Sequence, residues 1–313
     1  MRIVFFGTPQ FAANTLAYLL SRGVNIVAVV TRPDSAKGRS GTPSPSEVKS
    51  LAQTVSTIPI LQPERASTTE FEAALKSFNA DLFVVVAYGE ILSQAILDIP
   101  AKGCINVHAS LLPKYRGAAP IQRCLINGES ESGVSIMYLV KKMDAGDVIM
   151  TDTVPINEET TAGELEALLC KAGCGALHGV IRDLAKGIVN RTPQNETLAT
   201  FAPKIEGEEC ELHWSRPARQ LHNLVRGATP RPGAWCRVML RGQEKRLKIL
   251  KTRLVLEKGG LSAGALLEVS HSLVVACSEG ALELLEVQLE GKRPLSALEF
   301  CRGLPPFALS FQL

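Results

Sequence analysis

The chain has 313 residues and a mass of 33.7 kDa, with 46% hydrophobic residues, 21% charged residues and a net charge of +3. These values exclude disordered, collagen-like and low-complexity proteins and leave enough apolar side chains for a sizeable core. The length favours two domains. No apolar run approaches the roughly 20 residues that a membrane-spanning helix needs, so we expect no membrane partner.

The chain begins with a short apolar run, residues 3–6, which ends at Gly7 and Pro9. It is shorter than the roughly 7–15 apolar residues of a secretory signal and predicts a first β-strand. The eight cysteines are scattered, without a CxxC pair and without histidines at zinc spacing. We therefore expect free thiols, no bound metal and a bacterial cytoplasmic protein.

The first part of the chain, residues 1–189, alternates short β-branched runs with helical patterns. Capping boxes, at Thr69 with Glu72 and at Thr161 with Glu164, predict the starts of two helices. The alternation predicts an α/β domain with a doubly wound parallel sheet. The expected strands are residues 3–6, 25–31, 82–87, 105–108, 134–139 and 148–155. The expected helices are residues 9–21, 69–78 and 161–186.

Residues 190–208 are polar and without periodicity, which predicts a linker. Ser215 as N-cap and Pro217 in the first turn predict a helix over residues 215–226. Short strands separated by glycine-containing turns then suggest a small antiparallel barrel, closed by a helix near residues 295–301. The expected barrel strands are residues 234–240, 246–251, 265–269, 273–276 and 281–288.

One long stretch of the chain is strongly basic. Residues 213–258 hold twelve Lys or Arg against two acidic residues, Glu244 and Glu257. Such an excess is typical of a polyanion-binding surface, with nucleic acid the first candidate, and the alternative is a solvated basic face. The candidate phosphate contacts are Arg219, Arg226, Arg231, Arg237, Arg241, Lys245, Arg246 and Lys248.

The loop after the first strand does not fit a dinucleotide site. A pyrophosphate fingerprint needs three glycines, and here Gly7 stands alone while Pro9 removes a backbone donor. Nicotinamide and flavin enzymes are therefore disfavoured.

The most informative stretch is residues 104–117. Asn106 and His108 alternate along a strand that ends at the carboxyl edge of the sheet, so their side chains share one side, where open α/β sheets bind ligands. An amide donor beside an imidazole suits oxyanion stabilisation and proton transfer in acyl transfer. Asp144, in a later glycine-containing loop, is a candidate to orient His108. From spacing alone, a structural histidine and a turn aspartate remain the alternatives.

A longer match surrounds these residues. The string Asn106-Val-His108-Ala-Ser110-Leu111-Leu112-Pro113, followed by Lys-Tyr-Arg-Gly and then Asp144, resembles the 10-formyltetrahydrofolate-dependent formyltransferases. The members that act on tRNA are further matched by Val-Phe-Phe-Gly-Thr-Pro at the start, by Val-Val-Ala-Tyr88-Gly89-Glu-Ile91-Leu92 and by Arg116-Gly-Ala-Ala-Pro120-Ile-Gln-Arg123. The resemblance spans nearly the whole chain. It implies a Rossmann-like catalytic domain over residues 1–189, a linker over 190–208 and a basic OB-like β-barrel domain that binds tRNA over 209–313.

The resemblance also implies roles for single residues. It implies transfer of a formyl group from 10-formyltetrahydrofolate to the α-amino group of methionine on initiator tRNA, for translation initiation. Asn106, His108 and Asp144 would be catalytic. Ser110, Leu111, Leu112, Pro113, Tyr88, Gly89, Ile91 and Leu92 would bind the folate. The loop at residues 32–46, which reaches the tRNA acceptor stem in the family, offers only Lys37 and Arg39 as internal cations. None of these expected contacts requires more than one copy of the chain, so we expect a monomer.

Three alternatives stay open. The same residues would also serve to formylate a small amine, such as an amino sugar nucleotide or glycinamide ribonucleotide, or to hydrolyse the formyl-folate. A non-catalytic RNA-binding module is the third. The basic stretch argues against small acceptors, and the intact Asn/His/Asp set argues against a module without activity.

Overall fold

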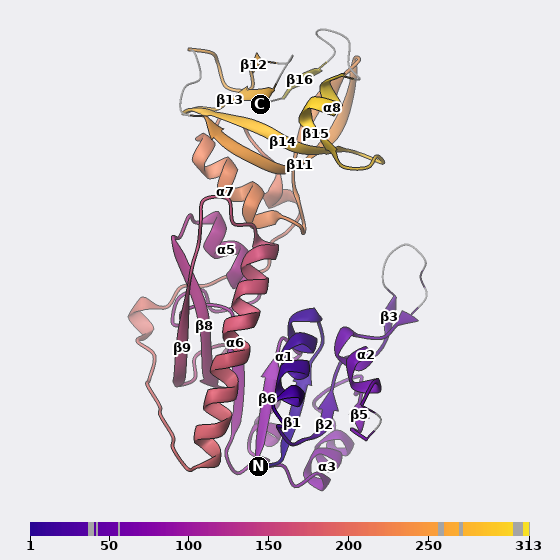
Figure 1. The fold of residues 1–313 in the computed structure, drawn as a ribbon, viewed down its shortest axis with the longest axis vertical. Coiled ribbons are helices and arrows are strands. Elements are labelled where there is room, and N and C mark those ends of the chain that lie inside the picture. The colour runs from indigo at the N-terminus through magenta and orange to yellow at the C-terminus, as the bar shows by residue number, and fades with distance from the viewer. Residues whose placement is uncertain are drawn as a thin grey trace. The chain divides into compact units, whose positions relative to one another are not determined.

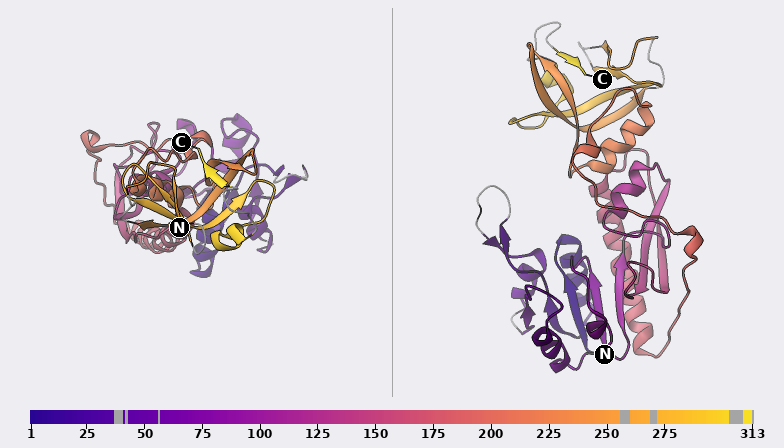
Figure 2. Two further views of the ribbon diagram at one scale, coloured as in Figure 1. Left: turned by 90° about the horizontal axis from the view of Figure 1, so that it is seen from above. Right: turned by 180° about the vertical axis from the view of Figure 1, so that it is seen from behind.

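The computed structural model describes residues 1–36, 41, 43–55, 57–255, 260–268, 272–302 and 309–312. Lys37 and Arg39 lie outside these described residues. The chain divides into two compact units (Figures 1 and 2). The first unit comprises Met1–Gly117, Glu131–Pro155 and Glu166–Phe201, and the second comprises Ala118–Ser130, Ile156–Leu165 and Ala202–Leu313. The polar segment 190–208 is therefore shared between the two units.

The first unit is built on one seven-stranded sheet with the order β5-β2-β1-β6-β7-β8-β9. Its strands are β1 (Ile3–Gly7), β2 (Ile26–Val30), β5 (Ile60–Leu61), β6 (Leu82–Val86), β7 (Cys104–His108), β8 (Glu131–Tyr138) and β9 (Val148–Pro155). The strands from β5 to β7 pair in parallel, which confirms the Rossmann-like α/β class. Strands β8 and β9 pair antiparallel, so the sheet is dominated by parallel pairs without being parallel throughout. Apolar runs predict buried strands but carry no information on strand direction.

Helices cover both faces of this sheet. They are α1 (Gln10–Ser21), α2 (Glu47–Gln53), α3 (Thr69–Ser77), α4 (Gln94–Leu97) and α6 (Ala162–Ala185). α1 and α6 lie together, because the Cys174 sulfur is 3.8 Å from the Thr15 hydroxyl and the Tyr18 and His178 rings meet edge-on. On the other face, residues of α3 and α4 pack against apolar residues of β1, β2 and β6. A short strand pair, β3 (Ser35–Ala36) and β4 (Pro43–Ser44), stands apart.

One capping box is confirmed, and the other does not form because the N-cap lies one residue earlier. The backbone N–H of Glu164 donates to the Thr161 hydroxyl, and the N–H of Thr161 donates to the Glu164 carboxylate. At α3 the N-cap is Thr68, whose hydroxyl accepts from Phe71. Both threonines of the Thr68–Thr69 pair are good caps, so the residue type alone could not choose between them.

The second unit holds an antiparallel sheet with the order β12-β13-β14-β11-β10-β16, as expected for an OB-like domain. Its strands are β10 (Ala234–Leu240), β11 (Gln243–Val255), β12 (Leu266–Glu268), β13 (Leu273–Ala276), β14 (Ala281–Leu289), β15 (Leu295–Ser296), which pairs with β14, and β16 (Leu309–Phe311). Its helices are α5 (Pro120–Ile126), α7 (Ala218–Ala228) and α8 (Ala297–Arg302).

Trp214 is buried in the core of the second unit, with Leu221 and Leu224 of α7 and the inward side chains of the sheet.

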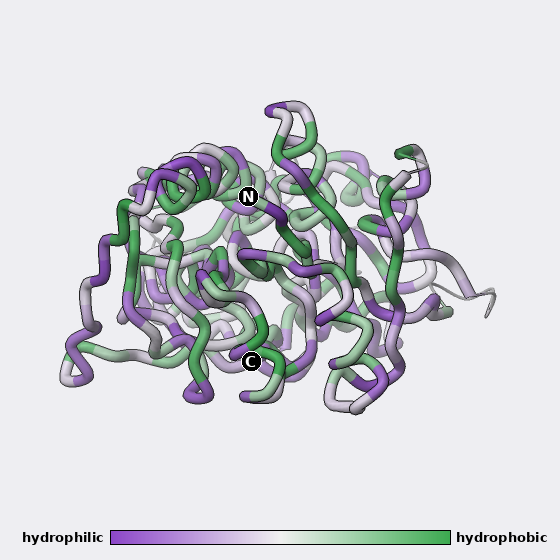
Figure 3. The backbone as a smooth tube through the Cα atoms, turned by 90° about the horizontal axis from the view of Figure 1, so that it is seen from below, coloured by the Kyte–Doolittle hydropathy of each residue, from purple (hydrophilic) through white to green (hydrophobic). Residues whose placement is uncertain are grey.

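The expected start of α7 at Ser215 is wrong. Pro217 is itself the N-cap, with an extended ψ of 142°, so the helix begins at Ala218. Figure 3 shows how hydrophobic and hydrophilic residues alternate along the chain.

Candidate active site

Strand β7 carries the two central polar side chains. Val107 lies under α6, since a side chain at Gly173 would sit 3.1 Å from a Val107 methyl. Its neighbours Asn106 and His108 therefore project from the opposite face of the sheet. The Asn106 side chain is half-buried and has no hydrogen-bond partner among the described residues, so its amide N–H groups remain available as donors.

His108 is 6% exposed and is held on two sides. Its Nε2 lies 2.9 Å from the Tyr115 carbonyl oxygen, which can only accept, so Nε2 carries a proton. Its Nδ1 faces the Asp144 carboxylate oxygen Oδ2 at 3.7 Å, too far for a direct hydrogen bond. The same Asp144 oxygen accepts from the Gly117 N–H at 2.8 Å. The structure thus brings together the predicted histidine and aspartate, with a gap between them that a proton-bearing group can bridge.

The loop that carries Asp144 is tightly folded. Asp144 has a φ of +48°, in the left-handed region that non-glycine residues rarely adopt. At Gly146 a Cβ would lie 1.8 Å from the Tyr138 carbonyl oxygen, so only glycine fits there. The Tyr138 N–H donates to the Asp147 carbonyl and closes the loop against the end of β8. A carboxylate in such a loop keeps its place only if surrounding contacts fix the backbone.

The segment expected to bind folate after β7 forms a compact turn. Ser110 is buried, and its hydroxyl donates to the Lys114 carbonyl, so that proton is used inside the turn. The Ser135 hydroxyl of β8 donates to the Ser110 carbonyl and accepts from the Leu112 N–H. Leu111 lies over Gly133, where a Cβ would meet a Leu111 methyl at 2.4 Å. The apolar side chains of this turn are half-buried.

The second expected folate segment follows β6 and is divided between core and surface. Tyr88 packs edge-on against Phe6 with ring centroids 5.6 Å apart, and burial raises the pKa of its hydroxyl to about 12. Leu92 is buried as well, whereas Ile91 is 81% exposed. Gly89 has a φ of +92° and its carbonyl accepts from Arg32. Of these residues, Ile91 therefore offers the largest accessible apolar surface.

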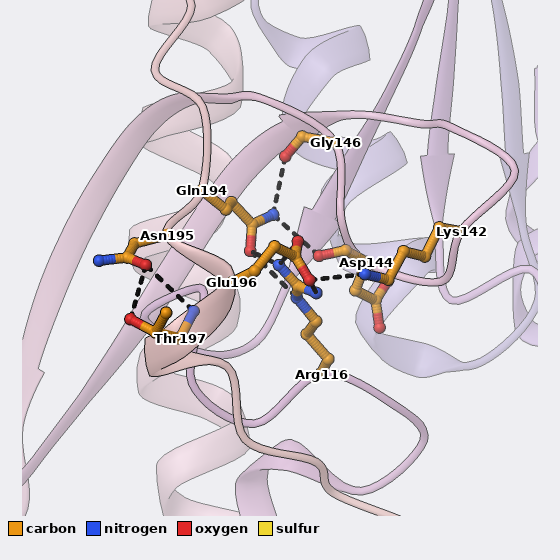
Figure 4. A network of polar contacts seen from close by, with 8 residues as sticks. All are labelled: Arg116, Lys142, Asp144, Gly146, Gln194, Asn195, Glu196 and Thr197. Atoms are coloured by element: carbon orange, nitrogen blue, oxygen red, sulfur yellow. Dashed lines mark hydrogen bonds and ion pairs between the residues drawn. The ribbon is translucent and has the colours of Figure 1, made fainter.

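A segment that sequence reasoning assigned to the linker borders the catalytic loop (Figure 4). Arg116, which is 1% exposed, donates to the Gln194 side-chain oxygen and to the Glu196 carboxylate. Glu196 also pairs with Lys142, and hydrogen bonds from Arg116 and then Lys142 lower its pKa to about 2. The polar residues here carry no local motif, so the sequence alone gave no signal for these contacts.

A cavity of about 470 Å³ opens beside the loop after β2. Most of its lining residues are polar or charged, and Asp34 among them is held by Lys49 and Gln62, whose hydrogen bonds lower the Asp34 pKa. The Thr8 hydroxyl at its edge donates to the Tyr88 carbonyl, which ties the loop after β1 to the loop after β6. The cavity is lined by Thr8, Arg32, Pro33, Asp34, Ser35, Ser46, Glu47 and Glu64.

The candidate phosphate contacts of the second unit differ in availability. The expectation that Arg226 contacts a phosphate is wrong. Its side chain is 7% exposed, and its guanidinium donates to the Asn223 side chain and to two backbone carbonyls, so it is not available to a phosphate. Arg219 is paired with Glu158. Arg237 is paired with two glutamates, and Arg241 also has a partner. The remaining candidates have no ion-pair partner among the described residues, and they are Arg231, Lys245, Arg246 and Lys248.

Strands β10 and β11 present several of these residues on one face. Arg237 stands opposite Arg246, and Trp235 stands opposite Lys248. The Arg246 guanidinium carbon lies 3.9 Å from the centre of the Trp235 ring, which fixes that cation in place. We call Trp235, Arg237, Arg246 and Lys248 the basic face.

Within the described ranges, no group of three His, Cys, Asp or Glu side chains could hold a metal ion. All eight cysteines are buried thiols that form no disulfide. No helix in the described part of the chain is long and apolar enough to cross a bilayer.

Solved structures share this fold. The chain resembles HypX from Aquifex aeolicus in complex with tetrahydrofolic acid, with a TM-score of 0.65 and 16% identity, over 96% of this chain and 46% of that one. It thus spans about half the length of HypX. It also resembles WlaRD, a sugar 3N-formyl transferase, with a TM-score of 0.65 and 18% identity, over 94% of this chain and 99% of that one.

Sequence comparisons identify the family. Residues 1–181 match the family described as formyl transferase, and residues 204–305 match the formyl transferase C-terminal domain. The chain is 51% identical to the methionyl-tRNA formyltransferase of Protochlamydia amoebophila, over 99% of this chain and 98% of that protein. It is 42% identical to that of Moorella thermoacetica, over 97% of each. The resemblance found in the sequence is confirmed, and the chain belongs to the formyl transferase family.

Proposed function

We propose that this chain transfers a formyl group from N10 of 10-formyltetrahydrofolate to the α-amino group of methionine esterified to initiator tRNA. The observation that carries the proposal is the arrangement on β7: the free Asn106 amide shares a face with His108, whose Nδ1 points at Asp144. The acceptor is inferred from relatives that are named methionyl-tRNA formyltransferase and match over nearly the full chain.

The reaction forms one bond and breaks one bond. The neutral amine attacks the formyl carbon, and an oxyanion develops on the formyl oxygen. An α-amino group titrates near roughly 7.7–8.0, and the adjacent ester lowers this further, so a useful share of it is already neutral at cytoplasmic pH. When the bond to N10 breaks, the amine nitrogen has lost one proton and N10 has gained one. The protein therefore has two tasks, which are to stabilise the oxyanion and to move a proton.

The side chains of Asn106, His108 and Asp144 suit both tasks. The Asn106 amide donates one hydrogen bond to the oxyanion. Because His108 Nε2 is committed to the Tyr115 carbonyl, the second donor is Nδ1 in its protonated state, with the resulting cation stabilised by Asp144. Asp144, which keeps its own hydrogen bond from Gly117, accepts the amine proton through a bridging water and returns it toward N10.

The formyl donor is a co-substrate, and the residues beside β7 fit its flat ring. The half-buried Leu111, Leu112 and Pro113 offer apolar surface after β7, and Ile91 offers more after β6. In this assignment Ser110 supports the turn, while Tyr88 and Leu92 support the floor of the site. Gly89 gives the chain its left-handed turn between them.

We assign formyl transfer to residues 1–189 and tRNA binding to residues 209–313, joined by residues 190–208. The basic face, with Arg231 and Lys245, supplies the sequence-independent phosphate contacts, which position a nucleic acid without reading it. Lys37 and Arg39 are proposed to contact the acceptor stem. No partner copy is required for any of these contacts.

The proposal is tested by an acceptor comparison. The full chain is incubated with 10-formyltetrahydrofolate and methionyl initiator tRNA, free methionine, an amino sugar nucleotide or glycinamide ribonucleotide, or no acceptor. Free tetrahydrofolate and formylated product are both measured. Formylation of the charged tRNA alone supports the proposal. Formylation of a small amine, folate release without acceptor, or tRNA binding without any transfer would each replace it.

A further inference from the structure

Gln194 touches both chain segments that hold the catalytic pair. Its Nε2 donates to the carbonyl oxygens of Asp144 at 2.8 Å and Gly146 at 2.7 Å. Its Oε1 accepts from Arg116, at 3.1 Å from Nε and 2.8 Å from Nη2 (Figure 4). One side-chain amide therefore joins the loop of Asp144 to the turn that follows β7.

The chemistry of these partners fixes how the amide is oriented. Two carbonyls can only accept, and a guanidinium can only donate, so the nitrogen of Gln194 must face Asp144 and Gly146 while its oxygen faces Arg116. Both N–H groups and both lone pairs of the amide are then in use. Glu and Met have side chains of about the same length as Gln. The carboxylate of Glu would place an acceptor against the two carbonyls, and the thioether of Met would make none of the four hydrogen bonds.

Arg116 lies between the two groups that hold the catalytic pair. The residue before it, Tyr115, supplies the carbonyl that accepts from His108, and the residue after it, Gly117, donates to the Asp144 carboxylate. Its own guanidinium is almost wholly buried and is held by Gln194 and Glu196. Any shift of Gln194 therefore moves either the Asp144 backbone or the turn that carries the His108 acceptor.

The segment around Gln194 is itself anchored along its length. Thr192 exchanges two backbone hydrogen bonds with Val148. Thr200 accepts from the Tyr115 N–H through its hydroxyl and from Arg116 through its carbonyl. The backbone on both sides of Gln194 is therefore held in place, and its side chain reaches the loop of Asp144 from a fixed position.

We propose that Gln194 is a positioning residue for catalysis, which sets the place of the Asp144 carboxylate opposite His108 Nδ1. This rests on the proposed formyl transfer. Asp144 occupies a left-handed backbone conformation, which persists only under such restraint, and its carbonyl is one of the two that Gln194 binds. A misplacement of about 1 Å in a catalytic group can cost 10²-fold in rate.

The test uses Gln194→Met and Gln194→Glu in the full chain, with Asn195→Ala as matched control. Asn195 accepts two hydrogen bonds from Thr197 and none from the catalytic loop. We expect both Gln194 variants to lower kcat about 10- to 10²-fold with KM for folate and tRNA within about twofold, since ground-state contacts are untouched. The control should stay within about twofold of the parent, because its lost bonds are local to residues 195–197.

A double variant separates positioning from general damage. Once Asp144→Asn has removed the carboxylate, Gln194→Met should cost little more, because it acts through that group. Equal losses in the presence and absence of the Asp144 carboxylate would overturn the proposal, as would a parent-like kcat in either Gln194 variant. If Gln194→Met does not fold, Gln194→Glu, which keeps the Arg116 contact, decides the outcome. A parent enzyme that transfers no formyl group would instead refute the proposed function.

Discussion

The catalytic edge, defined by Asn106, His108 and Asp144, and the basic face of β10 and β11 use charged and polar groups in opposite ways. At the catalytic edge, backbone groups hold the imidazole and the carboxylate, and the Asn106 amide has no hydrogen-bond partner among the described residues. On the basic face, Arg237 is already paired with Glu211 and Glu244. The motif of Asn106 and His108 therefore predicts side chains that are placed for chemistry. The count of Lys and Arg residues overstates the number of cations that are available to a phosphate.

The two buried arginines show the same difference. Arg116 in the first unit meets a carboxylate, Glu196. Arg226 in the second unit donates, within the described residues, to neutral oxygens of the Asn223 side chain and of the Leu125 and Asn157 carbonyls, and burial lowers its pKa. Arg116 is tied to the catalytic loop, while Arg226 joins α7 to the segments at 118–130 and 156–165 of its own unit. We therefore expect a substitution of Arg116 to disturb the loop that carries Asp144, and a substitution of Arg226 to lower the stability of the second unit.

The largest effect is expected at the catalytic edge. Asn106→Ala removes one oxyanion donor and should lower the rate of formyl transfer by about 10²–10³. His108→Ala and Asp144→Asn should each abolish most turnover. Affinity for methionyl-tRNA should remain within about twofold, because the basic face is untouched. Single-turnover rates and tRNA binding are measured on the same preparations. A loss of affinity as large as the loss of rate would contradict the division between the two regions.

A smaller effect, on stability, is expected at the buried arginine of the second unit. Arg226→Met removes the donor to the buried Asn223 side-chain oxygen, and an unsatisfied buried group costs roughly 1–3 kcal/mol. The carbonyls of Leu125 and Asn157 keep their donors from the N–H groups of Gly128 and Thr160. We expect a loss of about 1–3 kcal/mol in the unfolding free energy, measured by urea denaturation. The salt dependence of tRNA binding should be unchanged. A reduced salt slope without destabilisation would return Arg226 to the set of phosphate contacts.

Much of the catalytic edge could be predicted from sequence because its parts are consecutive. Asn106 and His108 share a side by strand periodicity, and the turn at residues 110–113 follows directly. Gln194 could not be predicted, since its partners lie 48 to 78 residues away along the chain. No helical or strand pattern marks a residue whose role is to bridge two distant loops.

The errors in the fold have similar physical causes. The antiparallel direction of β8 and β9 depends on where the chain returns after α5, which hydrophobicity does not record. Helix α5 itself was missed, although Pro120 at its first turn is a recognised start signal. Arg226 was misassigned because its burial depends on segments 118–130 and 156–165 joining the second unit, and nothing near Arg226 announces this.

The buried His222 of the second unit predicts how the stability of the protein depends on pH. His222 uses both nitrogens, toward the Thr252 hydroxyl and the Glu158 carbonyl, and burial lowers its pKa below the ordinary 6.5 despite the opposing pull of that carbonyl. The unfolded chain therefore takes up a proton first on acidification. Stability should be complete above pH 6.5 and should fall below it, by at most about 1.4 kcal/mol per pH unit.

His222→Gln removes this titration. The difference in unfolding free energy between parent and variant should narrow between pH 7 and pH 5.5, measured by urea denaturation at each pH. The charged side chains of Arg219, Arg226 and Glu159 also face this site. A difference that is constant with pH would show that His222 is not the group responsible.

The smallest effect is expected for single cations of the second unit. If Arg231, Lys245, Arg246 and Lys248 all meet phosphates of a duplex stem, log affinity should fall with log salt with a slope of about −3 to −4, from roughly −0.9 per contact. Lys248→Gln should reduce that slope by about 0.9 and weaken binding of every tRNA alike, since a phosphate contact reads no sequence. Arg219→Gln should change the slope less, because Arg219 is already paired with Glu158. Salt titrations of tRNA binding by the full-length variants measure both values. Equal slope changes for Lys248 and Arg219 would mean that the ion pair opens when tRNA binds, and the number of positive charges in the sequence would then be the better guide to this surface.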